Sequence, residues 1–229
     1  AHQFRPPGPP AMTSGTYARA LLEVETLGRQ IGGARTDEQT LIARFWEDGM
    51  QTSTPSGHWN AIALQEIAGL PLAKQLDILL VLNIAMADAG MAAWDAKYHY
   101  RFWRPVTAIQ EASVDGNPQT SSDSRWWPYI QSPMFPEYVS GHSAFSSAAA
   151  TVLSHFLGSH PITIGTESMV GGIKRSFASF DAAAEEAGRS RIYGGIHFQF
   201  SNWDGLELGR RVADWTISRL SPIALASAN

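Results

Sequence analysis

The chain has 229 residues, of which 44% are hydrophobic, and this is enough apolar material for one substantial core or two small ones. Its formal net charge of -4, from 17 basic and 21 acidic residues, lacks the basic excess typical of proteins that bind nucleic acid or anionic membranes. Because there is no cysteine, disulfides, thiolate catalysis and cysteine metal sites are excluded, whereas the cellular compartment stays open.

The first 15 residues, AHQFRPPGPPAMTSG, are rich in proline and glycine and predict an extended linker. They show no initiator methionine and no signal-peptide pattern, so we expect the numbering to begin within a longer protein. Apolar residues are spread evenly over the rest of the chain, which predicts that residues 1–229 form a single helical domain.

Three helices are predicted in the first part of the chain. Residues 16–28 carry apolar side chains at helical spacing, and Thr36 with Gln39 forms the pattern of a capping box that opens a second helix. A third helix is expected to begin near His58.

A long helix is predicted from Pro71, which suits a first helical position, toward Trp103, and Gly90 could break it. Its apolar sequence is interrupted by three polar residues: Asp77, Asn83 and Asp88. Burial within a helical bundle therefore fits this segment better than a membrane span.

The second half of the chain begins with a long loop, residues 112–139, which contains four prolines among serine, asparagine and aspartate residues. Residues 140–158 then predict a helix, and further helices fit residues 176–188 and 205–220. No segment shows the sustained alternation of strands, so the predicted fold class is an all-α helical bundle.

A first candidate site lies near the end of the long helix. Lys97 and Arg104 are seven residues apart, which is two helical turns, so their side chains share a face about 10 Å apart along the axis. They could converge on one anion. A solvated basic face is the ordinary alternative, although the aromatic neighbours and Pro105 make it less typical here.

A second candidate is the tripeptide Ser140, Gly141 and His142, which begins a predicted helix. The first helical turn offers unpaired backbone N–H groups and a positive dipole end, and both favour a bound oxyanion. Gly141 permits close approach, Ser140 can add a hydrogen bond, and His142 titrates near neutrality. Taken alone, an N-capping serine explains the same pattern.

The same tripeptide occurs earlier, ending at His58, but there is no Lys or Arg between Arg44 and Lys74 to complete an anion site. We interpret this copy as a helix start. His58 and Trp59 could still line a pocket.

A third candidate combines Arg191 and His197 with glycines on either side, which permit a tight backbone path beside a ligand. A core histidine is the alternative.

The three motifs together read K-x6-RP, SGH and SR-x5-H, and this order resembles the vanadium-dependent haloperoxidases and the type 2 phosphatidic acid phosphatase superfamily that shares their site. The match runs from Lys97 to His197, and the flanking helices resemble the bacterial haloperoxidase branch. The resemblance implies the helical bundle of these families. It also implies that this chain is the C-terminal catalytic half, since family peroxidases have a second bundle upstream.

The resemblance implies a role for each motif residue. Five groups would bind the oxygens of vanadate or phosphate: Lys97, Arg104, Arg191, Ser140 and the Gly141 amide. His197 would be the axial vanadium ligand of a peroxidase or the phosphoryl-accepting nucleophile of a phosphatase. His142 would be its acid–base partner, and Lys97 would polarise peroxide. Several fixed cations around one oxyanion are physically consistent with either chemistry.

The implied activity is a haloperoxidase that uses vanadate and hydrogen peroxide to oxidise halide to hypohalous acid, which then acts on a small organic substrate. Two alternatives stay open. One is an acid phosphatase that forms a phosphohistidine, and the other is a partial, non-catalytic module that needs a partner chain or a homo-oligomer. A periplasmic or secreted location is favoured by the resemblance alone.

Two positions depart from the superfamily pattern. The third motif commonly continues H-x3-D, but position 201 is Ser, so the carboxylate expected to orient His197 is missing and Asp204 or a backbone carbonyl is expected to replace it. This absence counts against a phosphatase. Val139 also stands where proline usually precedes the second motif.

Other enzyme classes are poorly supported. No G-x-S-x-G elbow follows a strand, which argues against a Ser-His-Asp hydrolase. Neither HExxH nor cysteine ligands occur, which argues against a zinc enzyme.

Overall fold

The computed structural model describes residues 2–166 and 171–226. Its elements are the 3-10 helices η1 (His2–Phe4) and η2 (Ala112–Val114), the helices α1 (Gly15–Gly28), α2 (Asp37–Phe45), α3 (Thr54–Ile67), α4 (Leu72–Tyr100), α5 (Pro105–Gln110), α6 (Gly141–Leu157), α7 (Phe180–Tyr193) and α8 (Gln199–Ala226), and the strands β1 (Ile162–Gly165) and β2 (Lys174–Phe177). The fold is a helical bundle, so the predicted all-α class is confirmed.

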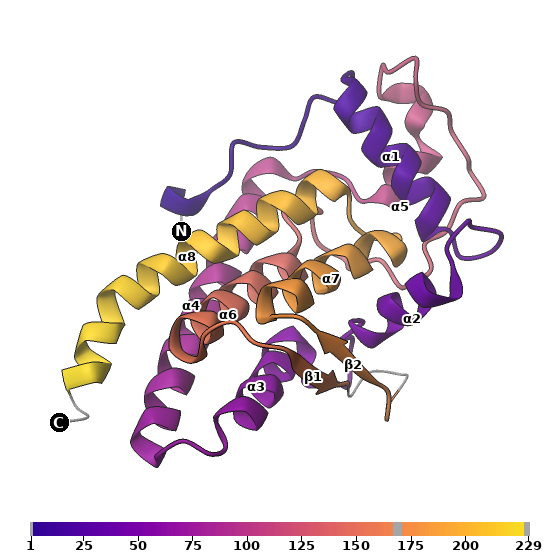
Figure 1. Ribbon diagram of the computed structural model, residues 1–229. Coiled ribbons are helices and arrows are strands. Elements are labelled where there is room, and N and C mark those ends of the chain that lie inside the picture. The colour runs from indigo at the N-terminus through magenta and orange to yellow at the C-terminus, as the bar shows by residue number, and fades with distance from the viewer. Residues whose placement is uncertain (1, 167–170, 227–229) are drawn as a thin grey trace.

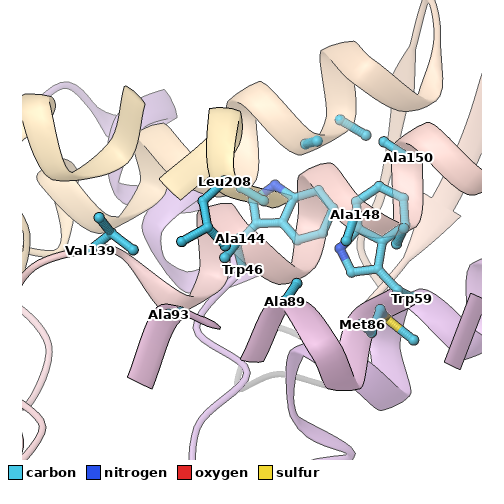
Figure 2. Packing of buried hydrophobic residues seen from close by; sticks show 14 of the residues in the cluster. Trp46, Trp59, Met86, Ala89, Ala93, Val139, Ala144, Ala148, Ala150 and Leu208 are labelled. Atoms are coloured by element: carbon cyan, nitrogen blue, oxygen red, sulfur yellow. The ribbon is translucent and has the colours of Figure 1, made fainter. Parts of the chain in front are cut away.

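Helix α6 is the centre of the bundle and packs most extensively against α8, α4 and α7. In Figure 1, α8 runs along α4 and α6, whereas α1 and α2 lie at the end of the bundle away from the C-terminus. Ala144 and Ala148 of α6 lie between Leu208 of α8 and Ala89 of α4 (Figure 2), and all four are buried. Small side chains on α6 therefore let three helices approach one another closely.

Two glycines of α8 set how closely it lies on α6. A Cβ atom on Gly205 would stand 2.7 Å from the Ser140 carbonyl oxygen, and one on Gly209 would collide with the Ala144 carbonyl. Backbone atoms cannot move aside as side-chain tips do, so these positions require glycine. The same contact holds the N-terminus of α6, where the second Ser-Gly-His lies, against α8.

Helix α4 continues through Gly90, so the prediction that this glycine could break the helix is wrong. A Cβ atom there would lie 2.8 Å from Phe145 Cε1, which shows that Gly90 serves close packing against α6. By length and composition alone α4 could cross a membrane, but half of its most apolar window is buried within the bundle. This burial fits the predicted core helix.

Most helix starts follow the local sequence signals. Thr36 and Gln39 form both hydrogen bonds of the predicted capping box, and Ser140 caps α6. The sequence analysis missed the short α5, in which Pro105 begins a helix rather than ending one, and the β1–β2 hairpin. The segment before α1 contains η1, and it is tied to α4 by an ion pair between Arg5 Nε and Asp95 of 2.7 Å.

Candidate functional site

The three sequence motifs meet in one buried region of the bundle. Lys97 lies in the last turn of α4 and Arg104 at the start of α5, Arg191 lies on α7, and His197 lies in the short connection to α8. Burial lowers the pKa of His197 well below its ordinary value, and the nearby charges of Arg104, Lys97 and Arg191 lower it further. His197 is therefore a neutral imidazole among three cations.

Arg104 is in direct contact with the His197 ring. Its Nη1 lies 3.1 Å from His197 Nε2 and donates to the Ile196 carbonyl at 2.8 Å. A guanidinium only donates, so Nε2 accepts and carries no proton in this arrangement. His197 is 3% exposed and Arg104 is 7% exposed, so water scarcely screens this contact.

Lys97 is completely buried and its ammonium faces main-chain oxygens. Nζ donates to the carbonyls of Val139 at 2.5 Å, Glu137 at 2.8 Å and Pro136 at 3.1 Å. Burial lowers its pKa well below the ordinary value, as does Arg104, whereas Glu137 raises it. Three carbonyl acceptors need all three hydrogens of an ammonium, so the geometry is that of a charged lysine.

Ser140 and Gly141 form the start of α6, as the sequence predicts. The Ser140 hydroxyl accepts from the Ser143 amide at 3.3 Å and from the Ser143 hydroxyl at 2.8 Å, so the N-capping interpretation is met. The Ser140 amide donates to the Ser201 carbonyl at 3.1 Å, which fixes the turn against α8. The close approach at Gly141 is to Trp94, whose Cζ3 would lie 3.1 Å from an added Cβ.

Arg191 joins α7 to the end of α2. Its Nη2 donates to the Trp46 carbonyl at 2.6 Å and to the Ala43 carbonyl at 3.4 Å, and Nη1 donates to the Glu47 carbonyl at 3.4 Å. Burial lowers its pKa to about 10, against the opposite effect of Asp48 and Glu47.

His142 lies next to this guanidinium. Part of the residue is accessible, but its Nε2 is buried and has no hydrogen-bond partner among the described residues. Burial lowers its pKa well below the ordinary value, and Arg191 lowers it further. An unpaired buried ring nitrogen beside a cation is suited to exchange a proton with a bound group.

Glu137, which was not among the predicted site residues, is fully buried beside His197. Its Oε1 accepts from His197 Nδ1 at 2.7 Å and from the Phe198 amide at 3.0 Å. Burial raises the Glu137 pKa to about 7, although Arg104 and Lys97 lower it. The available signal was an acidic residue, three positions before Ser140 of the second Ser-Gly-His, in an otherwise apolar stretch.

The expectation that Asp204 or a backbone carbonyl replaces the missing carboxylate is therefore wrong. Asp204 accepts from the Tyr138 hydroxyl at 2.6 Å, and the carboxylate on His197 comes from Glu137. Because His197 has a carboxylate partner, Ser201 no longer counts against a phosphatase.

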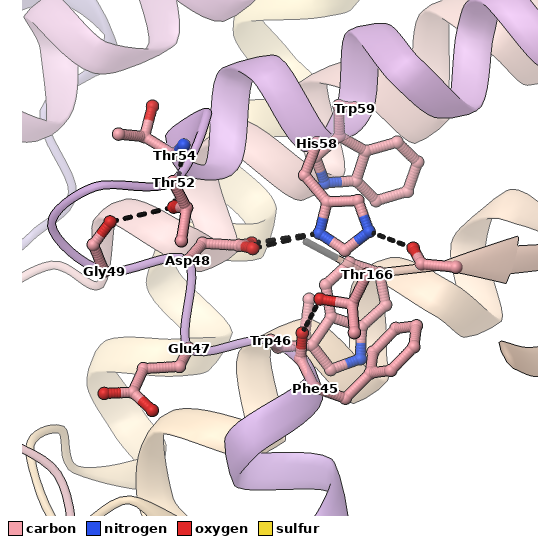
Figure 3. Close-up of polar contacts among 12 residues, drawn as sticks. Phe45, Trp46, Glu47, Asp48, Gly49, Thr52, Thr54, His58, Trp59 and Thr166 are labelled. Atoms are coloured by element: carbon pink, nitrogen blue, oxygen red, sulfur yellow. Dashed lines mark hydrogen bonds and ion pairs between the residues drawn. The ribbon is translucent and has the colours of Figure 1, made fainter. Parts of the chain in front are cut away.

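The first Ser-Gly-His lies in the first turn of α3, as predicted, and its histidine forms a second hydrogen-bonded group (Figure 3) close enough to act electrostatically on Arg191 and His142. His58 Nδ1 lies 3.1 and 3.2 Å from the two Asp48 oxygens, and Nε2 lies 2.8 Å from the Gly165 carbonyl oxygen. Both ring nitrogens are thus engaged, one by a carboxylate and one by a main-chain carbonyl. It lines a hollow of about 210 Å³ together with Gln65 and Thr166, while Trp59 Nε1 bonds to Ser146.

An oxyanion fits the donor set of the main cluster better than a bare cation does. Three cationic side chains, a helix N-terminus and the unpaired His142 Nε2 all favour a negatively charged guest. Within residues 2–166 and 171–226 there is no group of three or more His, Asp or Glu arranged to hold a metal ion directly. Vanadate or phosphate would instead be held through its oxygens by these cations and through its central atom by His197.

The chain is similar to known proteins in both sequence and fold. Residues 77–224 match the family described as VCPO second helical-bundle domain. The vanadium chloroperoxidase of Curvularia inaequalis is 26% identical over 90 residues, which are 34% of this chain and 14% of that protein. A crystal structure of a bacterial vanadium-dependent iodoperoxidase has a TM-score of 0.79 at 35% identity and covers 95% of this chain and 53% of its own.

A bacterial vanadium-dependent chloroperoxidase in its holo form shares the fold, with a TM-score of 0.73 at 20% identity over 97% of this chain and 52% of its own. This chain thus spans about half the length of both solved relatives. The matched residues 77–224 include every residue of the three motifs. The chain belongs to the family of the VCPO second helical-bundle domain, whose relatives are vanadium haloperoxidases.

Proposed function

We propose that this chain carries the catalytic site of a vanadium-dependent haloperoxidase that oxidises halide with hydrogen peroxide to hypohalous acid. The observation that carries the proposal is a neutral, buried His197 whose Nε2 lies 3.1 Å from Arg104, among the charges of Lys97 and Arg191. Family membership and the likeness to vanadium peroxidases support the same activity.

Each side chain has a task that follows from its position. Lys97, Arg104 and Arg191 neutralise the oxygens of the oxyanion, and their burial strengthens this attraction because water is excluded. His197 offers the Nε2 lone pair, and His142 holds or releases a proton at its unpaired Nε2. Vanadate, when bound, supplies a Lewis acid that makes hydrogen peroxide reactive toward halide.

An acid phosphatase is the second candidate, and one observation favours it. Glu137 bonds to Nδ1 of His197 at 2.7 Å, and such a carboxylate strengthens the nucleophilicity of the opposite ring nitrogen. His197 would then accept the phosphoryl group, and His142 would protonate the leaving oxygen.

The third candidate is a module that works only with another chain or a second copy. The length of the chain supports this candidate, because the chain covers only 53% and 52% of the lengths of the two solved relatives.

A single experiment separates the three candidates. The purified chain is stripped of bound anions, loaded with orthovanadate or with phosphate, and assayed for halide oxidation by hydrogen peroxide and for phosphate-ester hydrolysis. Halogenation that vanadate restores and phosphate blocks supports the peroxidase, whereas ester hydrolysis that vanadate inhibits supports the phosphatase. Absence of both activities, with a larger species in native mass spectrometry of the source material, supports the module.

A further inference from the structure

We propose that Glu137 is the positioning residue that fixes the orientation and tautomer of His197, in place of the acidic residue that the family pattern carries four positions after the histidine. This inference deepens the proposed function, because it concerns the same site. It rests on the contacts that Glu137, Arg104 and Ser201 make with one imidazole ring.

The hydrogen bonds on the two ring nitrogens agree on one tautomer. Arg104 Nη1, which can only donate, faces Nε2 at 3.1 Å, and Glu137 Oε1 faces Nδ1 at 2.7 Å. The neutral ring therefore carries its hydrogen on Nδ1 and directs the Nε2 lone pair toward the cations. If the hydrogen were on Nε2, this nitrogen would have no lone pair with which to bind the central atom of an oxyanion.

Position 201 shows why the carboxylate comes from elsewhere. Ser201 lies on the first turn of α8, and its hydroxyl is 3.5 Å from His197 Nδ1, too far for a strong hydrogen bond. A carboxylate at this position would reach the same nitrogen, but it would also face the Glu137 carboxylate in a buried site, where water scarcely screens the repulsion between two negative charges. The acidic side chain at position 137 therefore requires a neutral side chain at position 201, because two buried carboxylates would repel each other.

Glu137 is itself held rigidly. Its backbone amide donates to the Phe102 carbonyl at 3.0 Å, and its carbonyl accepts from Lys97 Nζ at 2.8 Å. Its Oε1 also accepts from the Phe198 amide, which belongs to the residue directly after His197. The carboxylate thus bridges the ring and the backbone that carries the ring, so both are fixed by one group.

The test reads the tautomer of His197 without vanadate, halide or peroxide. Long-range proton–nitrogen NMR correlation of the imidazole nitrogens, assigned with a His197→Gln variant, is expected to show the hydrogen on Nδ1 in the unsubstituted chain. In Glu137→Met, which keeps the size and removes both oxygens, the ring is expected to populate both tautomers. Binding of orthovanadate, measured by calorimetry, is expected to weaken about 10- to 100-fold, the usual effect of losing such a partner.

Rescue and control variants separate positioning from packing. The double variant Glu137→Met with Ser201→Asp returns a carboxylate to His197 from the other side, and it is expected to restore the Nδ1 hydrogen and most of the orthovanadate affinity. Asp204→Asn, which changes the neighbouring acidic residue, is expected to leave the tautomer unchanged.

The proposal is overturned if Glu137→Met keeps the single tautomer, or if the double variant folds without regaining it. If Glu137→Met fails to fold, the NMR tautomer of His197 in the double variant alone tests the proposal. The tautomer does not depend on halide oxidation, so a chain that shows the expected tautomers but no halogenation refutes the proposed function and leaves this inference standing.

Discussion

Replacing Lys97 by methionine is expected to weaken the binding of orthovanadate or inorganic phosphate strongly. At a charge separation of about 5 Å and an effective dielectric constant of about 20, the lost attraction is about 3 kcal/mol, or roughly 150-fold in affinity. The substitution also leaves three buried carbonyls without the Nζ donor. Each carbonyl costs about 1 kcal/mol or more, so the free energy of unfolding is expected to fall by about 3 kcal/mol.

Titration calorimetry at low salt measures the affinity, and urea unfolding measures the stability. Lys74→Met is the matched control, because Lys74 lies on the same helix about 35 Å from Lys97 along its axis. It removes the same charge and is expected to change neither quantity by more than a small factor. A folded Lys97→Met chain that binds both anions as tightly as the control would refute the role given to this cation.

Three further outcomes concern stability. The His197 pKa is lowered in the folded chain, so below about pH 6.5 the unfolded chain binds a proton that the folded chain does not, and the free energy of unfolding falls as the pH falls, by up to about 1.4 kcal/mol per pH unit. His197→Gln is expected to make this fall in urea unfolding curves shallower by that amount, while His142, whose pKa is also lowered, keeps its own contribution. Gly209→Ala, whose Cβ meets the Ala144 carbonyl, is expected to cost about 2 kcal/mol, whereas Gly69→Ala, which meets nothing within 4 Å, is expected to be neutral in the same measurement. Thr36→Ala removes a capping hydrogen bond and is expected to cost about 1 kcal/mol, seen as a lower Tm in calorimetry.

The parts of the fold that the sequence predicts are those decided by neighbouring residues. A helix start depends on a side chain and an amide three residues away, so Thr36 and Ser140 could be placed from the sequence. The effect of Gly90 depends on Phe145, which is 55 positions later, and no local pattern reveals that contact. The β1–β2 hairpin was missed because each strand has 4 residues, too few for an alternating pattern to stand out.

The candidate site divides in the same way. The prediction that Lys97 and Arg104 share one face of a single helix is wrong, because α4 ends at Tyr100 with Arg101 in the left-handed region and Arg104 directly precedes α5. The two cations still lie near one another across this helix break, and the resemblance supplied the remaining motifs. Glu137 was missed because its partner His197 is 60 positions away, and only the fold brings the loop before α6 beside the end of α7. Asp204 was the wrong choice for the opposite reason, since nearness along the chain does not turn its carboxylate toward the ring.

The main-chain oxygens around the cations have a consequence for how fast the site fills. Lys97 and Arg191 already hold carbonyls from the loop before α6 and from the end of α2. An arriving oxyanion therefore displaces these main-chain carbonyl oxygens, and little water has to be removed from the cations. The association rate of the oxyanion should then depend on how fast the carbonyls of these two backbone segments release the cations. It should respond to the flexibility of the segments more than to ionic strength.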